Sequence, residues 1–359
     1  MNLLWIIGNG FDLNLGLKTS YRGFIDSVYL NSLPNPEMER RRDELFDRVS
    51  RLGPGAAEQR DNWADLEKLL GDASVFYDDI SEFEATFEDI EGLLSKYIWE
   101  QNGIVGNDIP NEVVDCFRRS IYEFDGSVSE ADARKLKNPR KMRDCVSFSS
   151  ITLNYTTLFD RMVNKMKGDG PYANTRIVDG LTYGDVTYDP LHPHGVVADG
   201  GVDSIIFGVS NQEQIKNDEF SRDANFIESW VKQNRNEYYG NSNTNKIRRF
   251  IESADLICMF GCSFGETDDY IWRMVGEALK KNSNLRVASF VYGLGDKTRQ
   301  RVSVFQRKRD IQFNLLSRAF GIEYSEMSDR TVLIPSDKVF QMNLAANVDV
   351  ASSSNGAIS

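Results

Sequence analysis

Short, mainly apolar runs recur along the chain, and the last two are each followed by a segment with apolar residues at helical spacing. Such runs are typical of strands buried on both faces of a parallel sheet. The helical segments are Asp268–Lys281 and Asp296–Phe320. This alternation predicts an α/β fold with a doubly wound, mainly parallel sheet. The predicted strands are Leu3–Ile7, Val146–Leu153, Ser204–Val209, Ala254–Gly261 and Leu285–Tyr292.

A charged, helical segment separates the first predicted strand from the second. Within it, Trp63–Trp99 alternates acids with apolar residues, which indicates helices packed beside the sheet. Asp61 or Asn62 is expected to cap a helix, whereas Trp63 or Glu67 could instead face a substrate. The predicted organisation is a Rossmann-like nucleotide-binding domain at 1–30 and 146–340, large helical insertions at 31–145 and 212–253, and a disordered tail at 351–359.

The composition indicates a globular protein with an acidic surface. The 359 residues are 41% hydrophobic, enough for a large core, and carry a formal net charge of −12. This charge repels polyanions, so nucleic acid is not an expected partner. The apolar stretch Leu3–Ile7 is too short for a signal peptide or a membrane span, which predicts a cytoplasmic protein with no membrane partner. The four cysteines include no CxxC pair, so no metal is expected.

Both histidines of the chain lie in the tetrapeptide His192-Pro193-His194-Gly195. Histidine exchanges a proton near neutral pH, so the pair favours a general base. The alternative is a structural turn, in which Pro193 fixes φ and Gly195 allows a positive φ. A metal site would need a third ligand nearby. The turn should separate the two histidines, and we expect His194 to be the more important.

Small and polar residues follow three of the predicted strands. The amides of Gly8–Gly10 would be free to face a phosphate. Asn154 could hold a ribose hydroxyl or a water, or it could cap the helix Thr156–Met166. Ser263 could bind a phosphate or a ribose, and Thr267 or Asp268 could cap the helix that follows. Because the carboxyl ends of parallel strands meet at one edge, we expect these residues to share a ligand cleft.

Asp12 lies two residues after Gly10 and conflicts with phosphate binding. It could cap a helix that begins at Leu13, where the helix dipole stabilises a carboxylate, or it could point toward sugar hydroxyls. The cap is the favoured interpretation. If Asp12 meets a ligand instead, that ligand should present hydroxyls rather than phosphate at this position.

Several segments together resemble the bacteriophage abortive infection AbiH family; they are residues 6–13, 16–21, 153–156, 192–195 and 261–268. The AbiH pattern is itself similar to the sirtuin-like NAD-binding domains of antiphage effectors. The resemblance implies an antiphage toxin that binds NAD or a related adenine nucleotide and hydrolyses the nicotinamide–ribose bond of NAD, with NAD as substrate.

The resemblance also implies a set of site residues. Asn154 corresponds to the residue that positions the ribose or the attacking water, and His194 corresponds to the catalytic histidine. Gly8 and Gly10 correspond to the glycines of the phosphate loop. The other residues expected at the nucleotide are Asn9, Phe11, Asp12, Tyr155, His192 and Asp268, with Gly261 and Ser263 on the adenosine half.

The sequence departs from these relatives at Asn9, Asp12 and Thr156, which affects the expected substrate more than the fold. One alternative function is a non-catalytic nucleotide sensor or toxin component that acts through a protein partner. A hydride-transfer oxidoreductase is another, although the dinucleotide fingerprint is incomplete. We expect activity to be latent until a phage trigger protein or assembly into a homo-oligomer releases it, with 31–145 as the restraining segment.

Overall fold

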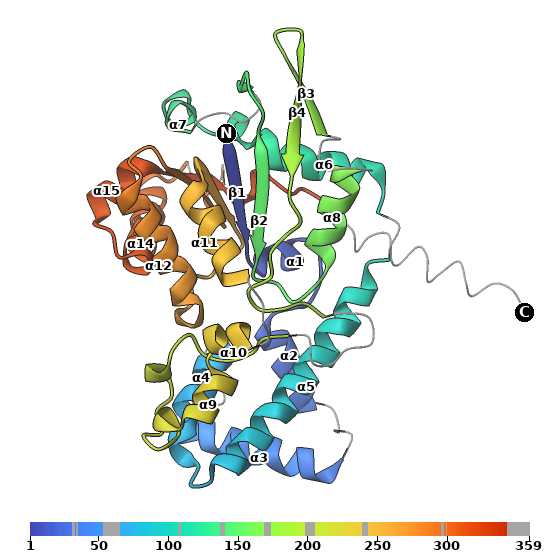
Figure 1. The fold of residues 1–359 in the computed structure, drawn as a ribbon, viewed down its shortest axis with the longest axis vertical. Helices are drawn as coiled ribbons and strands as arrows, with labels where there is room; N and C mark the ends of the chain where they lie inside the picture. The colour runs from blue at the N-terminus through green and yellow to red at the C-terminus, as the bar shows by residue number, and fades with distance from the viewer. Residues whose placement is uncertain are drawn as a thin grey trace, which may run out of the picture.

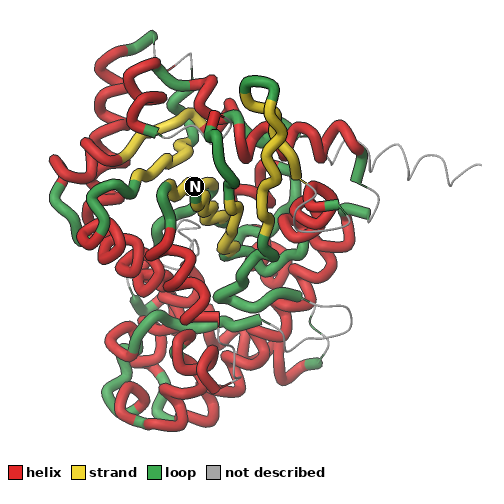
Figure 2. The backbone as a smooth tube through the Cα atoms, turned by 45° about the horizontal axis from the view of Figure 1, so that its top comes forward, coloured by secondary structure: helices red, strands yellow, loops and turns green. Residues whose placement is uncertain are grey.

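The computed structural model describes residues 1–30, 33, 35–52, 65–106, 109–136, 141–168, 174–197, 205–238, 243–295, 298 and 300–342. These residues form two lobes (Figure 1). The sheet lobe contains the strands with α1, α6, α8, α11, α12, α14 and α15, and the helical lobe contains α2–α5, α9 and α10. Figure 2 shows the strands gathered in the upper lobe, above a lobe of helices.

The described strands form one mixed, mostly parallel sheet in the order β3-β4-β2-β1-β5-β6-β7. Each neighbouring pair is parallel except the hairpin of β3 and β4. The strands are β1 (Asn2–Ile7), β2 (Ser147–Thr152), β3 (Asn174–Val178), β4 (Leu181–Thr187), β5 (Leu256–Phe260), β6 (Arg286–Val291) and β7 (Thr331–Pro335).

The central strand β1 is buried on both faces. Leu3, Trp5 and Ile7 belong to one apolar core, whereas Leu4 and Ile6 belong to another. This division explains why the strand is a continuous apolar run. The first core is covered by α1 (Gly10–Asn14), α6 (Asn111–Tyr122) and α8 (Leu158–Lys167), and the second by α11 (Asn243–Ser253), α12 (Asp269–Lys281), α14 (Val302–Phe320) and α15 (Tyr324–Arg330).

The helical lobe has its own core, in which aromatic residues such as Phe83, Phe87 and Trp230 pack together. Its helices are α2 (Tyr21–Leu30), α3 (Pro36–Ser50), α4 (Leu66–Ala73), α5 (Ile80–Ile104), α9 (Ala224–Trp230) and α10 (Lys232–Tyr238). Helix α7 (Glu130–Lys135) lies outside these cores. The described 3-10 turns are η2 (Ser74–Phe76), η3 (Phe124–Ser127), η5 (Gln212–Gln214), η6 (Phe220–Arg222), η7 (Glu266–Asp268) and η8 (Ser336–Lys338).

Four predicted strands are confirmed as β1, β2, β5 and β6, and the fifth is wrong. The described part of Ser204–Val209 makes isolated bridges instead of a strand. Its alternating apolar residues Ile205, Phe207 and Val209 are buried in the core of the helical lobe. The apolar run therefore reflected burial of an extended loop against helices, not membership of the sheet.

The predicted helices are confirmed with shifted boundaries. The first corresponds to α12, and the described part of the second to α14, which begins at Val302. Helix α4 begins at Leu66, because Asp65 accepts a hydrogen bond from the Lys68 amide over 3.1 Å. The predicted cap residues Asp61 and Asn62, together with Trp63, lie outside the described residues, as does the predicted tail at 351–359.

The predicted division into domains stays a prediction. Of the helices in the segment 31–145, α3, α4 and α5 belong to the helical lobe, whereas α6 packs on the sheet. The segment 212–253 divides similarly, since α9 belongs to the helical lobe and α11 covers the sheet. Across the described ranges, no helix combines the length and the apolar character that crossing a membrane requires.

Candidate functional site

A cavity of about 600 Å³ lies at the carboxyl ends of β1, β2 and β5, where the sheet lobe meets α4. Strand β1 pairs with β2 on one side and β5 on the other, so the chain order of the sheet reverses beside β1. In open α/β sheets, ligands bind at such a point. The predicted site residues that line this cavity are Gly8, Asn9, Gly10, Asp12, Asn154, Tyr155, His194, Gly261, Ser263 and Asp268.

The glycines of this cavity let two loops pass in direct contact. The amide of Gly8 donates to the carbonyl of Phe260 over 2.9 Å, and the amide of Gly10 donates to the carbonyl of Gly261 over 3.0 Å. A Cβ on Gly10 would lie 2.4 Å from the Cα of Gly261. The prediction that these two amides are free to face a phosphate is therefore wrong, because glycine is required here by the close approach of two backbones.

We expect Gly10→Ala to lower the free energy of unfolding by about 1–3 kcal/mol, because the added methyl group overpacks this contact. Gly103→Ala is the matched control in α5, since a Cβ there would meet no atom within 4 Å. The control should be neutral or should stabilise the protein by up to about 1 kcal/mol. Chemical denaturation measures both changes, and equal stability of the two variants would contradict the close approach.

Asp12 is 0% exposed and lines the cavity from the first turn of α1. Its Oδ2 accepts a hydrogen bond from Thr156 Oγ1 over 2.7 Å, whereas Oδ1 has no partner among the described residues. Burial raises the pKa of this carboxyl to about 6, although Thr156 and Asn154 lower it in part. The predicted cap is wrong, because α1 begins at Gly10 and Asp12 lies inside it.

The side chain of Asn154 is buried just after β2, and neither its Oδ1 nor its Nδ2 has a hydrogen-bond partner among the described residues. It does not cap the next helix, because α8 begins at Leu158 with Thr157 before it. Leaving a buried polar group unpaired costs about 1–3 kcal/mol. With Oδ1 of Asp12, the cavity wall thus holds three buried polar atoms. Asn154 already lowers the pKa of Asp12, and a ligand or water would satisfy the hydrogen-bonding capacity that remains.

His194 is buried between two hydrogen-bond acceptors. Its Nδ1 lies 3.1 Å from the carbonyl oxygen of Leu153, and its Nε2 lies 2.8 Å from Oδ1 of Asp268. The carbonyl can only accept, so Nδ1 carries a proton, and Nε2 faces the carboxylate. Asp268 makes no side-chain cap to α12. Both ring nitrogens therefore face protein oxygens.

A buried lysine connects this histidine to the helical lobe. Lys232 is 1% exposed, and its Nζ lies 2.7 Å from Oε2 of Glu67 and 3.2 Å from Oδ1 of Asp268. Burial alone would raise the pKa of Asp268, yet Lys232 and His194 hold it well below its usual value. Burial likewise opposes the charge on Lys232, but Asp268 and Glu67 raise its pKa above the usual value. Asp268 and Lys232 are therefore both ionised.

Two tyrosines and a further carboxyl complete the wall. The hydroxyl of Tyr155 lies 3.4 Å from the hydroxyl of Tyr21 and 3.4 Å from Oε1 of Glu67. Asp65 also lines the cavity, and burial together with the charge of Glu67 raises its pKa to about 6. Glu67, one of the residues predicted to be able to face a substrate, thus lies in the wall with its carboxylate bonded to Lys232.

Two predicted residues lie outside this wall. Nε2 of His192 lies 2.8 Å from Oδ1 of Asp160 on α8, and the ring of Phe11 packs edge-on against Phe159 with centroids 5.2 Å apart. Neither side chain lines the cavity. The two side chains therefore do not share the cavity with the other predicted site residues. The two histidines are separated as expected, since His192 contacts Asp160 and His194 contacts Asp268, and Gly195 has the predicted positive φ of 68°.

Sequence reasoning missed Lys232 and Arg22. Lys232 has no local signal, because its two partners come from α4 and η7. Arg22 directly follows residues 16–21, one of the segments that resemble the AbiH family. It is the one Arg or Lys among the described residues that line the cavity. Within the described ranges, no group of His, Cys, Asp and Glu side chains could hold a metal ion.

Comparison with known proteins places most of the chain in one family. The sequence matches the bacteriophage abortive infection AbiH family over residues 4–290. That range includes each residue described above as lining the cavity, from Gly8 to Asp268. No curated protein matches the chain. The match therefore covers both the strands that carry the site and the helical lobe beside it.

Proposed function

The chain belongs to the bacteriophage abortive infection AbiH family, and from this premise we propose that it acts in antiphage defence by hydrolysing the nicotinamide–ribose bond of NAD in the cavity beside β1. We also propose that the sheet is Rossmann-like and doubly wound. Helices cover both of its faces, and its chain order reverses at β1. A cavity of about 600 Å³ suits a ligand of this class.

The observation that carries the proposal is the set of unpaired atoms on Asp12 and Asn154. A carboxylate oxygen accepts hydrogen bonds, whereas an amide both donates and accepts. Sugar hydroxyls and a water molecule can satisfy all three atoms, but a phosphate could not bond to the carboxylate without repulsion. The pair therefore supports a ribose and an attacking water at this wall.

The charge of the cavity favours the cationic half of NAD at the inner wall. The nicotinamide ring of NAD is positively charged, and cleavage of its bond to ribose spreads positive charge onto the sugar. Asp12 and Asp65 both line the cavity, and their carboxylates would stabilise this positive charge. The amides of Gly8 and Gly10 already donate hydrogen bonds to the carbonyls of Phe260 and Gly261. We therefore assign the diphosphate to Arg22 and to Ser263, which follows Gly261.

The contacts favour Asp12 over His194 as the group that accepts the proton. Both nitrogens of His194 face protein oxygens, whereas Oδ1 of Asp12 makes no direct hydrogen bond, although Asn154 lies close enough to lower the pKa of the carboxyl. Water attacks the anomeric carbon, the carbon–nitrogen bond breaks, and its electron pair leaves with neutral nicotinamide. The proton released by water passes to Asp12, and Asn154 orients the water or the ribose. His194 and Asp268 hold the adjacent loops in place.

Incubation of the purified protein with NAD, with free nicotinamide as the readout, tests this function. We expect release that is lost in Asn154→Ala, while calorimetry shows that the variant still binds NAD. Binding by the unmodified chain without any release, also in the presence of phage lysate, would support the alternative of a non-catalytic nucleotide sensor. Absence of both binding and release would overturn the assignment of the cavity to NAD.

The pH dependence, measured in the unmodified protein and in a control variant, tests which carboxyl of the cavity titrates. Asp12 accepts a proton only when ionised, so we expect kcat/KM to rise with pH and to level off above an apparent pKa of about 6. Thr156, Asn154, Thr19 and the more distant Arg161 surround this carboxyl. Asp65 also has a pKa of about 6, so Asp65→Asn is the control. A profile that moves in the control would assign the titration to Asp65 instead.

A further inference from the structure

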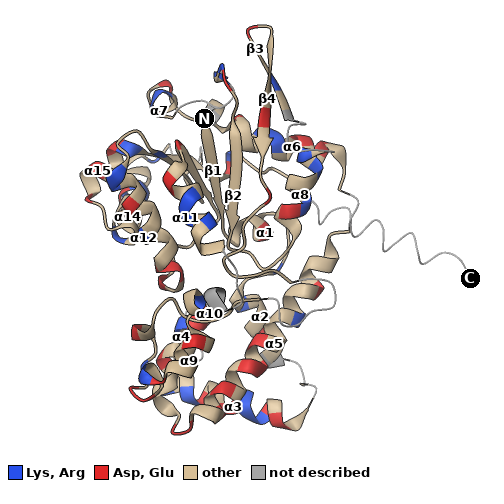
Figure 3. Ribbon diagram, viewed as in Figure 1, with Lys and Arg blue, Asp and Glu red and all other residues tan. Residues whose placement is uncertain are grey.

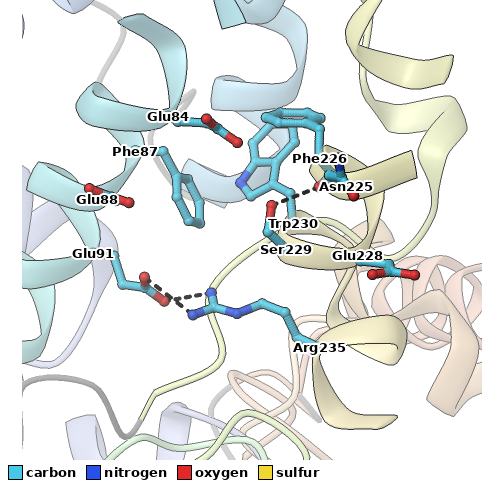
Figure 4. A pocket seen from close by; sticks show the side chains of 10 residues that line it. All are labelled: Glu84, Phe87, Glu88, Glu91, Asn225, Phe226, Glu228, Ser229, Trp230 and Arg235. Carbon is cyan, nitrogen blue, oxygen red and sulfur yellow. Dashed lines mark hydrogen bonds and ion pairs between the residues drawn. The ribbon is translucent and has the colours of Figure 1, made fainter. Parts of the chain in front are cut away.

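A second cavity, of about 450 Å³, lies within the helical lobe between α5, α9 and the start of α10. It shares no lining residue with the cavity beside β1. The view in Figure 4 shows side chains from these helices directed into one space. Its composition differs from that of the first cavity, since an aromatic floor is combined with an acidic rim.

Three aromatic side chains form the floor. The rings of Phe87 and Trp230 meet at 86° with centroids 5.5 Å apart, and those of Phe226 and Trp230 have centroids 5.3 Å apart. All three belong to the core of the helical lobe, so they are held by packing on their far sides. The face of an aromatic ring attracts a cation within about 6 Å of its centroid.

The rim carries an excess of negative charge. Acidic residues recur along α5 (Figure 3), and Glu84, Glu88 and Glu91 line the cavity together with Glu228 of α9. One of these charges is matched, since Arg235 lies 2.7 Å from Oε1 of Glu91. Burial and the charge of Glu88 raise the pKa of Glu84. Such repulsion between neighbouring carboxylates is relieved by a bound cation.

A second observation is independent of the acidic rim. The side chain of Trp230 is 1% exposed, and its Nε1 has no hydrogen-bond partner among the described residues. Figure 4 shows this nitrogen facing the space beside Phe87. An indole N–H can only donate, and buried donors are normally satisfied. The floor therefore offers a hydrogen bond to an acceptor atom of a ligand.

We propose that this cavity binds a small organic ammonium compound that also carries an oxygen acceptor. The cationic group lies over the aromatic floor and close to the carboxylates of Glu84 and Glu88, and the oxygen accepts the Trp230 Nε1–H. A simple alkyl cation satisfies the charge but not the indole, whereas a neutral alcohol satisfies the indole but not the charge. The two features together define the ligand class.

Three probes of similar shape separate these contributions. Choline has both features, tetramethylammonium has only the charge, and 3,3-dimethyl-1-butanol is the neutral counterpart of choline. The indole N–H resonance of Trp230 is identified as the one absent from the spectrum of Trp230→Phe. We expect choline to shift this resonance and to bind about tenfold more tightly than either of the other probes, which corresponds to about 1.4 kcal/mol.

Variants locate the site. The double variant Glu84→Gln, Glu88→Gln should bind choline about tenfold more weakly, and Trp230→Phe should reduce its advantage over tetramethylammonium. Glu100→Gln, an exposed position on the same helix, is the control and should bind choline normally. Thermal unfolding establishes that each variant is folded. Equal binding of choline and the neutral alcohol, unchanged binding in the double variant, or no binding of either cation would overturn the proposal.

Discussion

Asp12→Asn is expected to reduce the kcat of NAD hydrolysis by a factor of about 10²–10⁴, the range that a general base contributes. Asparagine has nearly the same shape, and its side-chain oxygen can still accept the hydrogen bond that Thr156 donates to Asp12 over 2.7 Å. What the variant loses is the capacity to take a proton at Oδ1, the oxygen that does not accept the Thr156 hydrogen bond. Steady-state release of nicotinamide measures the effect.

The stability of this variant should not fall in parallel. Burial raises the pKa of Asp12 to about 6, so a neutral amide avoids the cost of burying a charge there. Asp160→Asn is the matched control, because Asp160 lies on α8 outside the cavity and contacts His192. Full activity of Asp12→Asn, combined with inactive but folded His194→Ala, would return the role of base to His194.

The sheet could be predicted where burial alone determines the sequence. Strand β1 alternates between two cores, which leaves a run of apolar residues visible to any reader of the sequence. The hairpin of β3 and β4 was missed, since it projects from the sheet with Ile177 and Leu181 exposed. Its turn, Asp179-Gly180, has positive φ at both residues and is a recognised hairpin signal that hydrophobic patterning passes over.

The site could be predicted in part, because the ends of parallel strands converge regardless of what separates them in sequence. That rule brings together Asn154, His194 and Asp268. It cannot assign hydrogen-bond partners to each side chain or amide, and here those partners give Gly10 and Asp12 roles other than the predicted ones. The amide of Gly10 donates a hydrogen bond to the carbonyl of Gly261, and Asp12 is buried inside α1 rather than capping it. Such contacts depend on tertiary packing that no local pattern records.

Lys232 could not be predicted from the local sequence, because it neutralises two acids, Glu67 and Asp268, that come from distant segments. Lys232→Met preserves much of the side-chain volume but removes the cation. Glu67 would then be buried without its cation, and Asp268 would keep only its contact with His194. Breaking a buried ion pair on one side costs about 3–5 kcal/mol, and we expect the free energy of unfolding to fall by that amount.

The pH dependence of this loss follows from the sign of the shift. Lys232 and His194 hold the pKa of Asp268 below its unfolded value, so the ionised carboxylate stabilises the fold above the unfolded pKa, and this contribution is lost as the pH falls. Without the lysine that contribution shrinks, so Lys232→Met should be most destabilising near neutral pH and less so in acid. Denaturation at a series of pH values measures the difference.

Lys68→Met provides the comparison for this prediction, because Lys68 pairs with Glu266 at the surface, where both side chains are exposed. Exposed ion pairs contribute about 0–1 kcal/mol, so this variant should remain close to the unmodified protein. Adding Glu67→Gln to Lys232→Met should recover part of the lost stability, since it removes one uncompensated charge from the buried cluster. If Lys232→Met were as stable as Lys68→Met, the buried cluster would not contribute the stability that we assign to Lys232.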